Sequence, residues 1–264
     1  MITDMTHPES KIIDMLWEEQ MTARRPLINT FDGDFAAFVT TLPDLHEAFY
    51  RTSDGVVVPE PAVKCIDEGT DGGVRVAGVG VLMSLDKIVA ALEGLQIEVV
   101  HSHDGCGAAA LAATQTGTHV DDPDKLGQEF AAKVAKRLGA RHHHIRREQL
   151  RRPQNMHVAT VVYYSGVKAF NPALSDKLPN GFTITRALHA FPHPAQKEAD
   201  IACQIAFGAH GFDERFTSAH PLIIVPIGNP HRPELSVEAL TAELQPVLNT
   251  YGDRVMIAGF TSPY

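Results

Sequence analysis

The sequence predicts an α/β protein with a mostly parallel central β-sheet flanked by helices. The chain has 264 residues, 44% of them hydrophobic and 21% charged, which is enough to bury a substantial core. Short apolar segments typical of buried strands alternate with segments of helical periodicity. This alternation is the pattern of a parallel sheet that is covered by helices on both faces. We find no internal repeat in the sequence.

Residues 1–58 are expected to form a helical arm outside this sheet. One apolar stripe with helical spacing covers residues 12–17. A second stripe covers residues 35–49 and is interrupted at Pro43, because proline breaks a helix. Residues 59–264 then form a single α/β domain in this interpretation.

The first half of that domain shows strands and helices in turn. A short apolar segment at 62–66 predicts a strand, and Ser84 is a plausible N-cap for the helix that follows. Residues 97–100 predict a second buried strand, and a helix of small residues begins near Gly107. Asp122 and Pro123 open the next helix, which Gly139 ends.

The second half continues the same alternation. We expect strands at 157–164, 222–227 and 255–260, with helices at 195–207 and 236–249. Pro246 should kink or shorten the last helix.

Two predicted strands in the first half are followed by residues that can bind a metal ion. Cys65 and Asp67 follow the first strand, and period two places them on the same side. His103 and Cys106 follow the second strand. Because ligands bind at the carboxyl ends of parallel strands, these loops are expected to meet. Two thiolates, an imidazole and a carboxylate form a typical tetrahedral zinc set.

Other candidates in the chain have simpler interpretations. His101 lies on the same strand face as His103 and could be the ligand instead, although the His-x-x-Cys spacing favours His103. Cys203 lies on an apolar helix face and is interpreted as core. The run at 142–144 has a structural or solvent role in this interpretation, whereas His210 is a candidate proton shuttle.

The two loops together resemble the β-class carbonic anhydrases. Cys65-Ile66-Asp67 is similar to the family's Cys-x-Asp loop, and His103-Asp104-Gly105-Cys106-Gly107 is similar to its His-x-x-Cys-Gly loop. The stretch 75–78 also looks like the family's Arg-Asn-Ala-Gly, so the resemblance covers residues 60–115. The theta-class, low-carbon-inducible relatives of the same fold are possible kin.

This resemblance implies a zinc lyase that hydrates CO2 to bicarbonate. Zn2+ would be held by Cys65, His103 and Cys106, with Asp67 as a catalytic partner or fourth ligand. The family also forms homodimers in which N-terminal helices embrace the neighbouring chain, so a homodimer is expected.

One position departs from the family pattern. The family's Arg, which pairs with the Asp and keeps it off the zinc, is Gly69 here. Either another cation takes that role, Arg75 being the nearest Arg in sequence, or Asp67 closes the site. Two alternatives therefore stay open: a hydrolase of carbonyl sulfide or carbon disulfide, and a non-catalytic zinc protein.

Charge and composition limit the partners. The net charge of −9 argues against nucleic acid or anionic lipid as a partner. There is no apolar stretch of about 18 residues that would predict a membrane span. The three cysteines are too few and too scattered for a disulfide framework and indicate a reducing compartment. With no signal peptide at the start, we expect a cytoplasmic protein with a small-molecule substrate.

Overall fold

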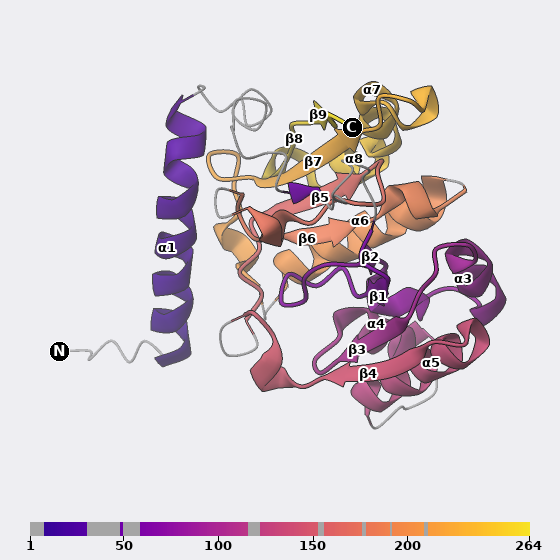
Figure 1. Ribbon diagram of the computed structural model, residues 1–264. Coiled ribbons are helices and arrows are strands. Elements are labelled where there is room, and N and C mark those ends of the chain that lie inside the picture. Colours follow the sequence, from indigo (N-terminus) through magenta and orange to yellow (C-terminus); the bar gives the residue numbers. More distant parts are fainter. Residues whose placement is uncertain are drawn as a thin grey trace.

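The computed structural model describes residues 8–30, 48–49, 59–115, 122–152, 156–175, 178–190, 192–208 and 211–264. In this part of the chain, parallel strands are flanked by helices, which confirms the predicted α/β class (Figure 1). The strands form two sheets, one of four strands and one of five, where the sequence predicted one central sheet.

The first sheet has the strand order β2-β1-β3-β4, and all of its pairs are parallel. Its strands are β1 (Ala62–Lys64), β2 (Val74–Arg75), β3 (Val99–His103) and β4 (Arg141–Ile145), and its helices are α3 (Leu85–Leu92), α4 (Gly107–Gln115) and α5 (Pro123–Leu138). Val63 of β1 pairs with both Val74 and Val100, so three buried valines lie side by side under α3 and α5.

The helix ends of this half lie where the sequence placed them. The side chain of Ser84 accepts a hydrogen bond from the Lys87 N–H at the start of α3. Asp122 caps α5 in the same way, with Pro123 in the first turn. Gly139 ends α5 with φ +69°, a left-handed conformation that favours glycine.

The second sheet has the order β6-β5-β7-β8, with β9 also paired to β7. Its strands are β5 (Val161–Ser165), β6 (Phe182–Ile184), β7 (Leu222–Gly228), β8 (Val255–Ile257) and β9 (Phe260–Thr261), and its helices are α6 (Pro192–Ala206), α7 (Val237–Glu243) and α8 (Gln245–Tyr251). The break between α7 and α8 falls at Leu244, with Pro246 in the first turn of α8, as the sequence predicts.

The two sheets repeat one arrangement, although the sequence shows no repeat. The first runs in chain order strand, strand, helix, strand, two helices, strand, and the second does the same from β5 to β8. In each sheet the first strand lies between the second and the third. The two halves therefore present equivalent sheet edges.

Hydrogen bonds join the two sheets. The N–H of Thr183 in β6 donates to the Ile66 carbonyl at 3.0 Å, and that of Thr185 donates to the Arg75 carbonyl at 3.1 Å. The Arg75 N–H donates in turn to the Thr185 hydroxyl at 2.8 Å. The loop that follows β1 is thus held against the second half of the chain.

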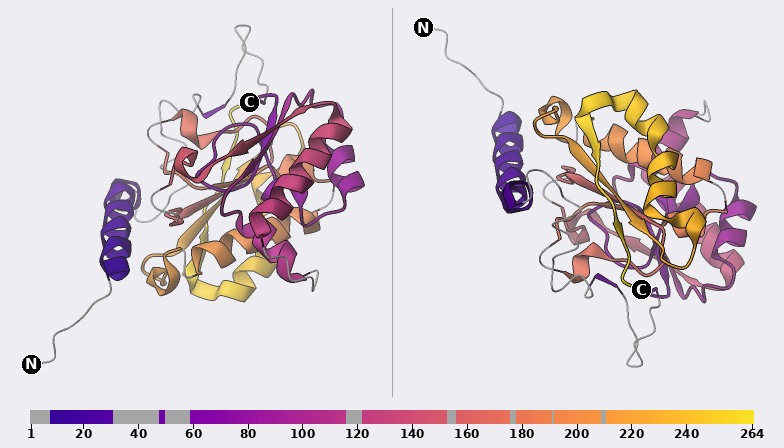
Figure 2. Two further views of the ribbon diagram at one scale, coloured as in Figure 1. Left: turned by 90° about the horizontal axis from the view of Figure 1, so that it is seen from below. Right: turned by 90° about the horizontal axis from the view of Figure 1, so that it is seen from above.

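The N-terminal arm contains a long helix, α1 (Pro8–Thr30), which stands to one side of the sheets in all three views (Figures 1 and 2). Trp17 attaches it through edge-on contacts with Phe212 and Phe216, at centroid distances of 4.9 and 5.3 Å. The predicted second stripe at 35–49 lies outside the described residues except for Ala48 and Phe49. Among the described helices, none has the length and apolar character needed to cross a membrane.

Candidate metal centre

The carboxyl ends of β1 and β3 bring together three side chains that can ligate a metal ion. Cys65 follows β1 directly, His103 is the last residue of β3, and Cys106 precedes α4. Because β1 and β3 are adjacent and parallel, these residues meet at one sheet edge. One ligand atom from each lies within 4.8 Å of the others, and the two sulfur atoms are 3.9 Å apart.

This geometry fits a tetrahedral ion. Two sulfur ligands about 2.3 Å from one zinc ion lie about 3.8 Å apart at the tetrahedral angle. All three side chains are buried, none of them more than 5% exposed. The Nε2 atom of His103 is buried and has no hydrogen-bond partner among the described residues. Its Nδ1 lies 2.9 Å from the Asp104 carbonyl, which orients the ring and leaves the lone pair of Nε2 to ligate a metal ion. Cys65, His103 and Cys106 are therefore positioned to bind a metal ion.

A tight turn at Ala77–Gly80 supports the first thiolate. The N–H of Gly78 donates to Cys65 Sγ at 3.2 Å. Gly78 has φ +52°, and a Cβ added there would come within 2.7 Å of Val81 Cγ1. Only glycine fits this position without strain, because the left-handed conformation and the close contact both disfavour a side chain.

The electrostatics of the cluster favour a cation. A hydrogen bond from Cys106 lowers the pKa of the Cys65 thiol well below its usual value, in spite of burial. Burial alone would lower the pKa of His103, but the negative charges of Asp67 and Cys65 raise it to about 9. A site that stabilises a proton on a fully buried imidazole also stabilises a positive metal ion.

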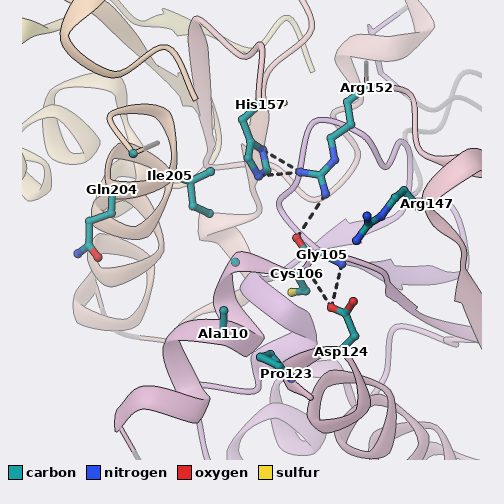
Figure 3. A pocket seen from close by; sticks show the side chains of 12 residues that line it. Gly105, Cys106, Ala110, Pro123, Asp124, Arg147, Arg152, His157, Gln204 and Ile205 are labelled. Carbon is teal, nitrogen blue, oxygen red and sulfur yellow. Dashed lines mark hydrogen bonds between the residues drawn. The ribbon is translucent and has the colours of Figure 1, made fainter. Parts of the chain in front are cut away.

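A carboxylate fixes the loop that carries Cys106. Asp124, in the first turn of α5, accepts the N–H of Gly105 at 2.8 Å and that of Cys106 at 3.3 Å through Oδ1 (Figure 3). The His-x-x-Cys loop is thereby tied to α5, so the helix that Asp122 and Pro123 begin also positions a metal ligand.

Asp67 lies beside the cluster, and its carboxylate is engaged on both oxygens. Oδ1 accepts the N–H of Gly69 at 2.7 Å, and Oδ2 lies 3.0 Å from Arg152. The side chains of Asp67 and Arg152 are only 4% and 2% exposed. Burial raises the pKa of Asp67, but the charges of His103, His157 and Arg152 outweigh this and hold it below its ordinary value.

Arg152 is a site residue that sequence reasoning missed. It comes from the segment after β4, which a hydrogen bond from the Arg151 N–H to the Gly69 carbonyl, at 2.8 Å, ties to the metal loop. A Cβ on Gly69 would come within 3.2 Å of Arg152 Cγ. The absence of a side chain at 69 thus leaves room for the arginine that pairs with Asp67. No local pattern around position 152 signals this contact.

Arg75, the cation suggested by the sequence, binds the loop backbone instead of the Asp67 carboxylate. Its guanidinium donates to the carbonyls of Asp67 and Thr70 at 2.6 and 2.7 Å. Arg75 therefore shapes the loop that presents Asp67, whereas Arg152 takes the ion-pairing position expected for Arg75.

A second cluster adjoins the first and consists of Asp67, Glu68 and His157. His157 Nδ1 lies 3.0 Å from the Glu68 carboxylate, and its Nε2 lies 2.7 Å from Arg152. Burial lowers the pKa of His157, but the Glu68 carboxylate raises it above its usual value. Glu68 is buried, and its carboxylate also accepts the N–H of Val158 at 3.0 Å.

A cavity of about 590 Å³ opens at this centre (Figure 3). Its polar side includes Cys106, Arg152 and His157, and its apolar side includes Ala110, Pro123 and Ile205, which come from α4, α5 and α6. Cys106 of the metal cluster and Arg152 of the Asp67–Arg152 pair thus both line this cavity.

The remaining candidates lie elsewhere. His101 stacks edge-on against His143 of β4, at a centroid distance of 5.3 Å, and is outside the ligand group. Cys203 is fully buried on α6 within the core. His142 and His144 both contact the Ser102 hydroxyl at 2.9 Å, so they connect β4 to β3. His210 lies outside the described residues.

Compared with protein-family models, with curated proteins and with solved structures, the chain matches none of them.

Proposed function

We propose that the protein is a zinc-dependent, carbonic-anhydrase-like lyase that converts CO2 and water to bicarbonate. The observation that carries this proposal is the pairing of Asp67 with Arg152 beside the Cys65, His103 and Cys106 cluster. Three protein ligands leave one position of a tetrahedral ion for a reactant, provided that the neighbouring carboxylate stays away from the metal.

Zinc is the ion that suits these donors best. Two thiolates and one imidazole in tetrahedral geometry are typical of zinc, whereas oxygen-rich sites suit magnesium and calcium. When bound at such a site, zinc supplies a nucleophilic hydroxide near neutral pH by lowering the pKa of its water from about 15.7 toward about 7.

The chain's own residues would hold and orient the reactants. Asp67, kept ionised and fixed by Gly69 and Arg152, accepts a hydrogen bond from the attacking oxygen and so directs its lone pair at carbon. Arg152 is a positioning residue, because it acts through Asp67. Ala110, Pro123 and Ile205 give the reactants an apolar wall in the cavity.

Two thiolates give the metal more negative charge than three neutral imidazoles would. An ion held by these ligands would be a weaker Lewis acid, so activity would develop at a higher pH. We therefore expect CO2 hydration to rise from pH 6 toward pH 9.

Carbonyl sulfide and carbon disulfide are the second candidate substrates. The apolar wall of the cavity at Ala110, Pro123 and Ile205 suits such linear apolar molecules. The non-catalytic alternative, a site closed by Asp67, is disfavoured because both oxygens of that carboxylate already have partners.

The decisive experiment combines metal analysis with stopped-flow CO2 hydration between pH 6 and 9. We expect one zinc per chain, together with activity that Cys106→Ser abolishes and Cys203→Ala retains. Zinc without activity toward CO2, but with hydrolysis of carbonyl sulfide, would favour the second substrate class. Absence of zinc from the wild type would overturn the proposal. The proposal also includes a homodimer, and light scattering would measure this oligomeric state.

A further inference from the structure

The metal centre lies at a defined topological point of the first sheet. From β1 the chain moves to β2 on one side and then to β3 on the other, so the direction of the strand order reverses between β1 and β3. Ligands of open α/β sheets bind at such a point, outside the carboxyl ends of the strands. Cys65, His103 and Cys106 come from these two loops.

The second sheet has the same point between β5 and β7, and a cavity of about 350 Å³ lies there. Its lining includes residues 166–169, which follow β5, and Asn229, His231 and Arg232, which follow β7. This volume is at the small end of the range for ligand sites. Position and size therefore both indicate a binding site for a small molecule.

The chemistry of this second cavity differs from that of the metal centre. Its described lining residues include no Cys, Asp or Glu, and His231 alone is of a metal-binding type. A metal ion would find too few ligands there.

Three residues with basic side chains line the cavity. Lys168, His231 and Arg232 line it. Lys168 is partly buried and forms no ion pair or hydrogen bond with any described residue. Arg232 pairs with Glu234 only at the exposed rim, where such a pair contributes little. No Asp or Glu side chain of the described lining lies beside these basic groups.

Two aromatic rings also line the cavity, and hydrogen bonds fix its loops. The rings of Phe49 and Tyr264 line it and pack edge-on, at a centroid distance of 5.6 Å. Asn229 ties the two loops together, because its Nδ2 donates to the Gly166 carbonyl at 3.2 Å and its Oδ1 accepts the His231 N–H at 2.9 Å. A ligand with an apolar body and an anionic group matches both the aromatic and the basic residues of this lining.

We propose that this second cavity binds a small organic carboxylate, with the carboxylate at Lys168 and the apolar body against Phe49 and Tyr264. The site is separate from the metal centre and does not depend on the proposed CO2 chemistry.

Calorimetric titration of the full chain with benzoate tests this site. We expect one benzoate per chain, binding more tightly than acetate, which lacks the apolar body, and more tightly than inorganic phosphate. Lys168→Met should weaken benzoate binding about tenfold, because it removes a charged partner and keeps the alkyl stem. Lys168→Arg should retain binding, and Lys87→Met, an exposed lysine of α3, should leave it unchanged.

Titration of Cys106→Ser distinguishes the two sites. Benzoate binding retained in this variant supports the second cavity, whereas its loss would place the anion at the metal centre and overturn the proposal. No binding to the wild type, binding that Lys168→Met does not weaken, or equal binding of acetate and benzoate would overturn it as well. None of these results depends on whether CO2 is hydrated.

Discussion

The side chain of Arg152 passes through the space that a side chain at Gly69 would need. A Cβ at position 69 would lie 3.2 Å from Arg152 Cγ and 2.9 Å from the Asp67 carboxylate that Arg152 neutralises. The loop after β1 has no arginine at position 69. The segment after β4 folds against this loop and supplies the positive charge through Arg152. The ion pair is buried, so removing one partner leaves an uncompensated charge.

Arg152→Gln should therefore reduce CO2 hydration about a hundredfold while the chain retains its metal, because Asp67 loses its fixed position. The double variant Gly69→Arg/Arg152→Ala moves the cation into the metal loop and removes the contact with Arg152 Cγ, while those with Asp67 Oδ1 and Leu150 Cβ stay, so it should restore part of the lost activity. Stopped-flow rates and metal content of the three proteins are the measurements. Full activity in Arg152→Gln would contradict the role given to this pair.

Gly78→Ala should weaken metal binding as well as folding. The variant strains a left-handed position and forces a methyl group toward Val81, which displaces the N–H that donates to Cys65. Gly94→Ala is the matched control, since Gly94 has φ +81° and nothing lies within 4 Å of its added Cβ. Both variants should lose about 1–2 kcal/mol of stability, but only Gly78→Ala should lower zinc affinity in a chelator competition. Equal affinities would argue against the N–H···S contact.

Asp124→Ala should loosen the loop that carries Cys106. Its carboxylate accepts hydrogen bonds from two backbone N–H groups of that loop. We therefore expect the free energy of unfolding to fall by about 1–3 kcal/mol and metal binding to weaken. Asp122→Ala removes an ordinary cap from the same helix and should cost about 1 kcal/mol without affecting the metal. Denaturant unfolding and zinc titration of the two variants separate these effects, and identical behaviour would refute the assignment.

The Glu68–His157 pair predicts a pH-dependent contribution to stability. Glu68 raises the pKa of His157 in the folded chain, so the contribution is fully present below the unfolded value of about 6.5 and is lost as the pH rises through the folded pKa. Glu68→Gln should thus cost about 1–3 kcal/mol at pH 6 and less at pH 9.

The control for this measurement is Glu243→Gln, which breaks the buried pair with Arg186. Burial lowers the pKa of Arg186, but the bonded carboxylate raises it above its usual value, so this arginine stays charged throughout the range. The free energy of unfolding that Glu243→Gln loses should therefore be the same at pH 6 and pH 9. Urea unfolding measures these losses of stability. If the loss in Glu68→Gln does not change with pH, a charged His157 is excluded.

The sequence predicted those features that depend on local chemistry. The caps at Ser84, Asp122 and Gly139 are set by residues within one turn of the helix end, and the structure confirms them. The meeting of Cys65, His103 and Cys106 follows from strands that end at one sheet edge, so it was predictable once the two strands were recognised.

Features that depend on distant contacts were not predicted. Strand β4 is formed by Arg, three His and Ile, so it has no apolar alternation; its pairing with β3 along all five residues makes it a strand. Strands β2 and β6 contain two and three residues, too few to show a period. Arg152 reaches Asp67 through tertiary folding alone, and the repeated sheet arrangement lies in strand order, which composition does not record.

Strand β4 has one further consequence, which concerns solubility. It is the outer strand of the first sheet as the structure describes it, and an outer strand exposes backbone groups that can recruit a strand from another molecule. Arg141, His142 and His143 are exposed along it. A polar, readily hydrated edge that carries the charge of Arg141 discourages such recruitment. We therefore expect the polar residues of β4 to disfavour edge-to-edge aggregation.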